Sequence, residues 1–256
     1  MPKYSIIYTA HNEVENFVQH ILPALRNQTE QDFEVIVGDD GSTDGLEARL
    51  KRFSGMDHGV SPICYVRQEN EGYGYTSIVN KAVSCSLGDY LVFLSGDTFP
   101  SDTFLEELGR ALKKDRVVTG KRRNVLREGD TWHVQSEDWR LTKPFIPFQA
   151  EVLIENGVEI FAVHHMDEEP WRMMTMNTLA CHRSTWNKVQ GLTPCYNGGY
   201  GKMDWSFCMK ALYSGCELWW NVAAIAYHID NGKPGREDTP ANTEAFEKEL
   251  AEWRKK

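Results

Sequence analysis

Long apolar runs are absent from this sequence. No stretch approaches the ~18 apolar residues that a membrane-spanning helix needs. The amino terminus also lacks the layout of a signal peptide, because a short apolar run at residues 4–8 is followed directly by Ala10-His11-Asn12-Glu13. We therefore expect a cytoplasmic protein that has no transmembrane segment.

Cysteine spacings typical of zinc sites are absent too. The six cysteines contain no C-x-x-C pair and stand mostly in apolar or helical surroundings (Cys64, Cys85, Cys181, Cys195, Cys208 and Cys216). In a reducing compartment this usage indicates buried thiols rather than bridges or metal ligands. We expect no structural zinc.

Positive charge is in short supply. Lys and Arg number 28 against 37 acidic residues, and the formal charge of −9 disfavours binding of nucleic acid or an anionic membrane by charge alone. The 256 residues, 41% of them hydrophobic, are otherwise typical of a folded domain and exclude a disulfide-stapled miniprotein. Any anionic ligand must therefore be held by a local site.

The first half of the chain alternates short apolar runs with amphipathic segments. We expect strands at 4–8, 33–38, 63–67 and 90–94, and helices at 14–25, 46–53 and 75–84, with Pro23 kinking or ending the first helix. This order predicts an α/β fold with a mostly parallel, twisted sheet flanked by helices and ligands at the carboxyl ends of its strands. The functional loops are then 9–13, 39–45, 67–75 and 95–101.

The second half is less regular. We expect a helix at 102–114, a short strand near Val117, long loops or a lid over 121–170, a strand at 173–180, a helix at 184–189 capped by Ser184, a helix at 205–214 and a buried strand at 218–226. A last amphipathic helix at about 241–256 should dock on the domain or on a partner. Without a repeat or a linker, residues 1–240 are predicted to form one domain, with halves at about 1–120 and 121–240.

Acidic residues follow several of the expected strands. Asp39-Asp40-Gly41-Ser42-Thr43-Asp44-Gly45 comes after the second strand, where carboxylates can accept hydrogen bonds from a base or a ribose, although an Asx turn with a helix cap explains this composition equally well. After the fourth strand, Asp97 either ligates Mg²⁺ or Mn²⁺ or serves only as a cap.

Two further segments bear on chemistry. The glycine-rich loop 197–202 leads into Asp204, which is either a functional carboxylate or an acid in the first turn of a helix. His228 ends a buried strand, and it is either a satisfied core histidine or a contact for a metal or a phosphate.

Taken in order, these segments resemble the family 2 glycosyltransferases of GT-A fold over roughly residues 3–230. The matching segments are the run from Tyr4 to Glu13, the Asp-Asp-Gly-Ser-Thr-Asp element, residues 94–100 and the Gly-Gly-Tyr-Gly-x-x-Asp-Trp loop. The later half also resembles the galactosyl- and N-acetylgalactosaminyl-transferase branch. The resemblance implies an inverting hexosyltransferase.

The resemblance also assigns roles to residues. The positions that match the donor-binding segments are Thr9, Ala10, Asn12, Glu13, Asp40 and Gly96, with Arg67 and Asn70 as further pyrophosphate or base contacts. Asp40 would accept the N3–H of uracil, which makes a UDP-sugar the expected donor. Asp97 would bind Mn²⁺ or Mg²⁺ at the diphosphate, and Asp204 would be the general base that activates an acceptor hydroxyl.

Two positions depart from the family pattern. Ser95 replaces the first acid of the usual Asp-x-Asp motif, so His228 would help Asp97 to hold the metal, and Met203 replaces the usual acid before the base. These departures keep open a catalytically silent nucleotide-sugar-binding protein. A sugar nucleotidyltransferase is a further alternative, although residues 9–13 lack its basic, glycine-rich loop. The acceptor is open among glycan, lipid-linked, protein and small-molecule hydroxyls, nucleic acid is disfavoured, and the oligomeric state is undetermined.

Several other groups are weaker candidates. Glu137-Asp138-Trp139 copies the acid-acid-aromatic pattern but lacks the preceding glycines. His164, His165 and Asp167 are expected to be polar loop residues, because neighbours in a strand face opposite sides. The basic run 121–123 is expected to be solvated, and most of the tryptophans are expected to lie in the core (Trp132, Trp139, Trp171, Trp205, Trp219 and Trp220).

Overall fold

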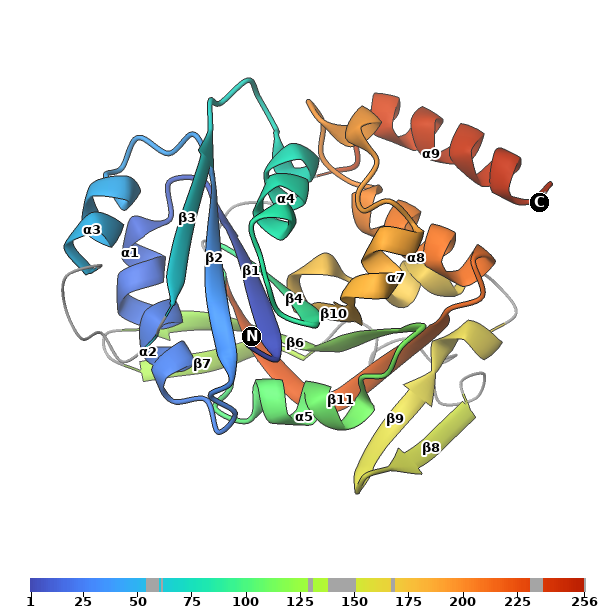
Figure 1. Cartoon of the computed structure of the whole chain (residues 1–256), viewed down its shortest axis with the longest axis horizontal. Helices are drawn as coiled ribbons and strands as arrows, with labels where there is room; N and C mark the ends of the chain where they lie inside the picture. The colour runs from blue at the N-terminus through green and yellow to red at the C-terminus, as the bar shows by residue number, and fades with distance from the viewer. Residues whose placement is uncertain are drawn as a thin grey trace.

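A large mixed sheet runs through the molecule, which we describe from a computed structural model (Figure 1). The structure describes residues 1–53, 60, 62–128, 131–137, 151–166, 169–230 and 237–255. Neighbouring strands follow the order β3-β2-β1-β4-β10-β6-β11-β9-β8, while β5 pairs with β11 and β7 pairs with β6. The predicted α/β fold with helices beside a central sheet is confirmed.

The first four strands form the parallel part of the sheet. They are β1 (Tyr4–Ala10), β2 (Phe33–Asp40), β3 (Ile63–Gln68) and β4 (Tyr90–Ser95). The register sets Thr9 opposite Gly38 on one side and Ser95 on the other, and it sets Asp40 opposite Gln68. The carboxyl ends of these strands, which carry the predicted functional loops, therefore meet at one edge of the sheet.

The two faces of this parallel part bury different side chains. Ile7 and Ile36 face a cluster shared with α4 (Tyr75–Ser84), whereas Ile6 and Tyr8 face a cluster shared with the opposite helices. Those helices are α1 (Val14–Asn16), α2 (Leu22–Arg26), α3 (Leu46–Phe53) and α5 (Phe104–Ala111). This alternation is the period of two that a strand buried on both faces must show.

The helix expected at 14–25 is distorted where the proline was predicted to disturb it. A π-helical segment, η1 (Phe17–Ile21), lies between α1 and α2 and ends just before Pro23. Proline lacks the N–H that an α-helix would use at this position, and its ring crowds the preceding turn. The wider π turn accommodates both effects.

The second half of the sheet corrects two predictions. β10 (Leu179–His182) runs antiparallel between β4 and β6 (Arg116–Glu128), whereas β6 runs parallel to β11 (Glu217–Ile229). Parallel pairing is therefore found among the first four strands and between β6 and β11, and the sheet as a whole is mixed rather than mostly parallel. The strand expected near Val117 is long, and the region predicted as loops contains β7 (Thr131–Ser136), β8 (Glu151–Glu155) and β9 (Val158–Ala162). Periodicity failed here because the outer part of β6 and most of β7 are incompletely buried.

Smaller differences concern the ends of elements. The strand expected at 173–180 is replaced by the 3-10 turns η4 (Pro170–Met173) and η5 (Met176–Thr178) before β10 begins. The side chain of His182, not Ser184, caps α7 (Arg183–Lys188) by accepting from the Ser184 N–H. Cys85 and Cys195 are exposed, against the expectation of buried thiols.

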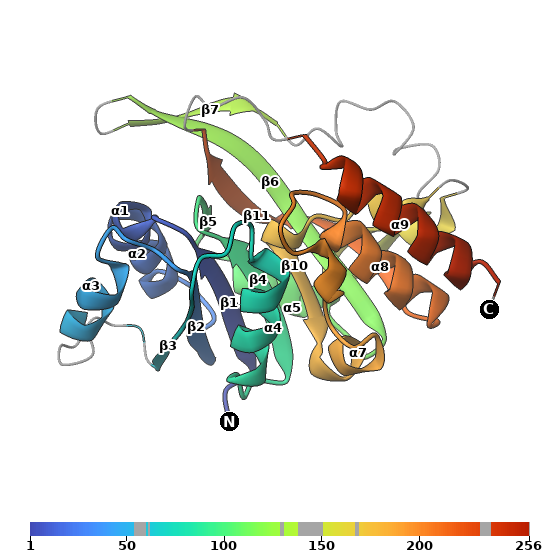
Figure 2. The same ribbon diagram turned by 90° about the horizontal axis from the view of Figure 1, so that it is seen from above.

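The carboxyl-terminal helix docks on the domain, which was one of the two locations expected for it. α9 (Pro240–Trp253) lies beside α8 (Met203–Tyr213), and its Phe246 and Leu250 are almost fully buried (Figure 2). The remaining short elements are β5 (Thr98–Pro100), η3 (Val163–His165) and η6 (Pro194–Tyr196). No helix within the described residues has the length and apolar character to cross a membrane.

Candidate functional site

The loop after β1 is hydrogen-bonded to the turn after β2. Asn12 adopts a left-handed conformation with φ of 58°, its N–H donates to Ser42 Oγ at 2.9 Å, and its Oδ1 accepts from the Thr43 N–H at 2.8 Å. Asp44 Oδ2 accepts from the N–H of Val14 at 2.7 Å and so satisfies the start of α1. Its other oxygen, Oδ1, accepts from the Leu46 N–H two residues on at 3.2 Å, so the Asx-turn interpretation of the Asp-rich segment holds for Asp44. The bonds of Asn12 and Asp44 together join the loop after β1 to the turn after β2.

Asp39 and Asp40 have different surroundings because consecutive strand residues face opposite sides. Asp39 is fully buried, where it accepts from the Ser42 N–H at 2.7 Å and from the Tyr65 hydroxyl at 2.5 Å. The guanidinium of Arg67 lies 3.6 Å from Asp39. Arg67 thus belongs to the surroundings of Asp39 in this structure.

Asp40 is held by two donors on the α4 side. Its Oδ1 accepts from Gln68 Nε2 at 2.6 Å, and its Oδ2 accepts from the Gly74 N–H at 2.9 Å. A carboxylate offers about four lone pairs, so each oxygen can still accept another hydrogen bond. Asn70, a further predicted contact, donates to the backbone carbonyl of Asp40 at 3.1 Å and closes the same turn.

Asp97 and His228 form the pair that was predicted as metal ligands. The Oδ2 of Asp97 lies 3.3 Å from His228 Nε2, and its Oδ1 accepts from the Ser95 hydroxyl at 2.8 Å. Burial opposes ionisation, but the hydrogen bonds and the charge of His228, together with the Ser95 hydroxyl, outweigh it and lower the pKa of Asp97 to about 2. Asp97 is therefore a carboxylate near neutral pH. Among the described residues, no group of three or more His, Cys, Asp or Glu could hold a metal ion by itself.

Gly96 allows the Asp97 loop to lie against the loop after β1. A side chain at this position would place its first carbon 2.5 Å from Glu13 Cγ and 3.2 Å from the carbonyl oxygen of Thr9. The carbonyl of Gly96 in turn accepts from the Tyr8 hydroxyl at 3.0 Å. The loop that contains Thr9 and Glu13 and the loop that contains Gly96 and Asp97 are far apart in the sequence. The structure brings these two loops together, as the order of strands predicted.

Asp204 lies at the start of α8, after Lys202 with its left-handed φ of 70°. Its Oδ1 accepts from the Trp205 N–H at 2.9 Å. Burial chiefly, with the nearby charge of Asp238, raises the pKa of Asp204 to about 6 against the opposing effects of backbone N–H groups and Lys202. A carboxylate with this pKa is ionised at pH 7 and still basic enough to accept a proton.

Tyr75 connects Asp204 to the loops after the strands. Its hydroxyl is hydrogen-bonded to Thr9, and burial, the neighbouring Tyr73 and the charge of Asp204 raise its pKa well above the ordinary value. The glycine-rich loop also meets the start of α4, where the Gly198 N–H donates to the Tyr73 carbonyl at 2.8 Å. The structure therefore sets Asp204 near the carboxyl end of β1.

Sequence reasoning missed the groups that support the Asp204 loop from α9. Asn242 is almost fully buried, and its Nδ2 contacts three loop carbonyls, those of Tyr196 at 3.3 Å, Gly199 at 3.0 Å and Gly201 at 2.9 Å. An asparagine in register with Phe246 and Leu250, on the apolar stripe of an amphipathic helix, was the available signal.

Further along α9, Glu249 supports the neighbouring elements. It accepts from the hydroxyls of Thr193 at 3.0 Å, Tyr196 at 2.6 Å and Ser206 at 2.6 Å. Near the start of α9, Asp238 pairs with Lys202 at 2.8 Å. The predicted docking of this helix thus also orders the loop that carries Asp204.

Most of the weaker candidates that the structure describes make ion pairs, contact backbone groups or lie in the core. Glu137 pairs with Lys121 and Arg123, and Asp138 and Trp139 lie outside the described residues. His164 contacts the Leu218 carbonyl at 2.9 Å, and Asp167 is likewise outside the described residues. Of the five described tryptophans among these candidates, three are buried (Trp171, Trp219 and Trp220), whereas Trp132 and Trp205 are only partly buried.

The sequence was also compared with known proteins. The family model described as "Glycosyl transferase family 2" matches residues 5–167. "Glycosyltransferase GlyA" of Streptococcus pneumoniae is 33% identical over 41% of this chain and 14% of its own length, and "Chondroitin synthase" of Pasteurella multocida is 24% identical over 85% of this chain and 23% of its own. The chain thus spans less than a quarter of either relative.

Solved structures share the fold. Crystal structures of Staphylococcus aureus TarS 1–349 in complex with UDP and with UDP-GlcNAc superimpose with TM-scores of 0.70 and 0.67 at 16% identity, covering 98% of this chain and 65% of theirs. Because the family model covers more than half of the sequence, the chain belongs to glycosyl transferase family 2.

Proposed function

We propose that this chain transfers a sugar from a UDP-sugar to an acceptor hydroxyl with inversion at the anomeric carbon. The observation that carries the proposal is that Asp204 lies near the donor loops. The loops after β1 and β4 lie against each other at Glu13 and Gly96. Asp204, a carboxylate with a raised pKa, lies near these loops through Tyr75, whose hydroxyl is hydrogen-bonded to Thr9. Membership of a glycosyltransferase family and a fold shared with a UDP-bound protein support it.

The nucleotide would bind at the carboxyl ends of β1 and β2. Thr9, Ala10, Asn12 and Glu13 line this edge, and the free lone pairs of Asp40 suit the ring N–H of uracil. The backbone turn is already fixed by the bonds from Asn12 to residues 42 and 43, so binding would order few additional groups.

A divalent cation fits the residues at Asp97. The Asp97 carboxylate and the His228 imidazole present one oxygen and one nitrogen 3.3 Å apart, and Mn²⁺ accepts both donor types, while diphosphate oxygens and water would complete its coordination. Ser95 orients the second carboxylate oxygen. When bound, such a cation supplies positive charge against the charge that grows on the departing diphosphate.

Asp204 would act as the general base. It removes the proton of the acceptor hydroxyl as that oxygen forms the new bond to the anomeric carbon and the bond to the diphosphate oxygen breaks, leaving UDP. General-base assistance of this kind is worth roughly 10²–10⁴-fold in rate. Met203, which replaces the acid found before the base in relatives, is buried and gives the acceptor side no extra charge.

The decisive assay is the release of UDP. UDP-GlcNAc is the first donor to test, because TarS has been crystallised with it, followed by other UDP-, GDP- and TDP-sugars in a thermal-shift screen with and without Mn²⁺. We expect stabilisation by UDP-sugars and slow hydrolysis to UDP in wild type but not in Asp204→Asn. Binding without turnover would instead indicate a silent binding protein, and a requirement for a sugar phosphate and an NTP would indicate a nucleotidyltransferase.

A further inference from the structure

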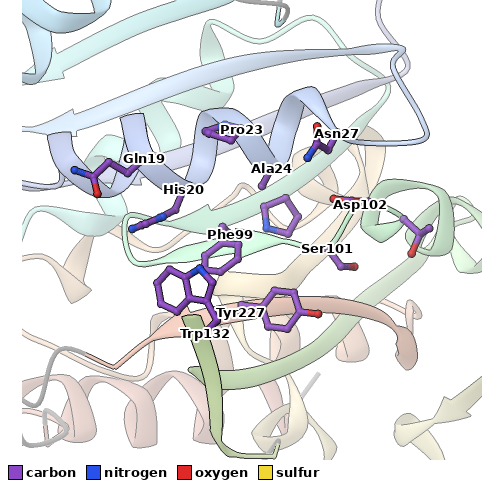
Figure 3. Close-up of a pocket in the computed structure, with 12 residues that line it drawn as sticks. Gln19, His20, Pro23, Ala24, Asn27, Phe99, Ser101, Asp102, Trp132 and Tyr227 are labelled. Atoms are coloured by element: carbon purple, nitrogen blue, oxygen red, sulfur yellow. The ribbon is translucent and has the colours of Figure 1, made fainter. Parts of the chain in front are cut away.

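A separate cavity of about 420 Å³ opens between the first helical segment and strands β5, β7 and β11 (Figure 3). This volume is within the range of about 300–1,000 Å³ that small-ligand sites occupy. Its lining includes three half-buried aromatic side chains, those of Phe99, Trp132 and Tyr227. The opposite wall is formed by α2, which carries Pro23, and by Asn27, which follows that helix.

The aromatic residues form a continuous wall. Ring centroids of Phe99 lie 5.3 Å from those of both Trp132 and Tyr227, and the His20 ring meets Trp132 edge-on at 4.9 Å. Burial and the nearby Arg127 lower the pKa of His20, which keeps this ring neutral at pH 7. The wall therefore presents uncharged ring faces.

Polar groups surround this wall. Gln19, Asn27 and Asp102 are exposed at the rim, and the buried Ser101 hydroxyl has no hydrogen-bond partner. A carboxylate at the rim repels phosphates and uronic acids but accepts hydrogen bonds from hydroxyls. The combination suits a neutral ligand that has one apolar face and hydroxyls at its edge.

The cavity faces away from the donor site. Thr98 pairs with His228 and Phe99 with Tyr227, so alternation along β5 and β11 turns Phe99 and Tyr227 to the face opposite His228. The cavity is thus separate from the Asp97–His228 pair while being built on the same two strands.

We propose that this cavity is a saccharide-binding subsite for a neutral pyranose unit of a glycan, distant from the reacting sugar. The C–H bonds of a pyranose ring carry partial positive charge and pack on the negative faces of aromatic rings, while its hydroxyls bond to amide and carboxylate groups. That the bound pyranose belongs to the glycan that accepts, or has already received, the transferred sugar rests on the proposed transferase function. Through β5 and β11, occupancy of the cavity would hold that glycan beside the domain.

The test measures the binding of two neutral probes, cellotriose and N-acetylchitotriose, to the full chain in the absence of a donor. Binding is detected by saturation-transfer NMR. We expect at least one probe to bind, about tenfold weaker binding in Trp132→Ala, unchanged binding in the matched control His133→Ala on the other face of β7, and no displacement by excess UDP. No binding of either probe, binding that survives Trp132→Ala, or displacement by UDP would each overturn the proposal.

A second variant guards against damage to the hairpin. Asn27→Ala/Asp102→Ala removes only exposed polar groups, and it should weaken binding several-fold with an unchanged melting temperature; unchanged binding in it also counts against the site. Because no donor is present, failure of the transferase proposal is read separately, from UDP release. Hydrolysis of UDP-GlcNAc by Trp132→Ala should equal that of wild type.

Discussion

Replacing the proposed base, Asp204→Asn, should make the protein more stable while it abolishes transfer. The carboxylate is partly shielded from solvent and lies near Asp238, so keeping it charged costs free energy in the folded state, whereas a neutral amide of the same shape does not carry this cost. The amide oxygen can still accept from the Trp205 N–H, which now bonds Oδ1 at 2.9 Å.

The magnitude follows from the pKa. A change from 3.8 to about 6 is about two units, and at about 1.4 kcal/mol per unit the charged carboxylate destabilises the fold by up to about 3 kcal/mol above pH 7. The folded state binds the proton of Asp204 more tightly than the unfolded state does. The stability that the protonated carboxyl confers is therefore fully present below pH 3.8 and is lost as the pH rises through about 6. The difference between variant and wild type should therefore fall to about a third by pH 4.5.

Thermal unfolding at pH 8 and pH 4.5 measures this difference. At about 2–4 °C per kcal/mol for a domain of this size, Asp204→Asn should melt up to about 6–12 °C above wild type at pH 8 and only a few degrees above it at pH 4.5. Asp89→Asn, at an exposed carboxylate, is the matched control and should change little. A variant less stable than wild type at pH 8, or a gap that is the same at both pH values, would refute the reasoning, as would full transfer activity.

Three other substitutions test the remaining contacts. His228→Ala should raise the Mn²⁺ concentration for half-maximal transfer about 10–100-fold, and an unchanged metal titration would argue against its role. Asn242→Ala leaves loop carbonyls without a donor, so the free energy of unfolding should fall by about 1–3 kcal/mol. In this variant kcat should fall more than the donor KM rises, and the acid limb of the pH profile of activity should shift. The neighbouring Thr243→Ala should leave all three quantities near their wild-type values. Gly96→Ala should weaken UDP binding at least tenfold in calorimetry by displacing Glu13, and unaltered affinity would contradict the close approach.

The parts of the fold that the sequence predicted are those with strong local signals. β1, β2 and β4 are buried on both faces and have compact apolar runs in the sequence. α4 was predicted with its observed bounds because its apolar residues recur at helical spacing. Parallel strands bring their carboxyl ends to one edge, so the meeting of the loops at Thr9, Asp40 and Asp97 followed from the order of elements.

The parts that could not be predicted depend on contacts between distant segments. The charged outer half of β6 is ordered by pairing with β7 and by ion pairs from Lys121 and Arg123 to Glu137, none of which leaves a periodic pattern in the sequence. In the same way, an amide at position 242 is compatible with any exposed helix, and its role appears only when α9 packs on α8.

The site joins two parts of the molecule that depend differently on the two apolar clusters. The loop of Asp204 is held by α4, α8 and α9, whose apolar residues belong to the cluster that contains Ile7. The strands before the loops of Glu13 and Asp97 contribute to both clusters, since Tyr8 and Leu94 belong to the cluster on the other face. The hydrogen bond that the Thr9 hydroxyl donates to the Tyr75 oxygen is a direct link between these parts near the proposed base. Because the buried apolar residues of α9 belong only to the cluster that contains Ile7, whereas the strands before the donor loops are also packed in the other cluster, loosening α9 should affect the base first and leave the nucleotide loops in place. For this reason kcat, rather than donor binding, is the quantity that reports on Asn242.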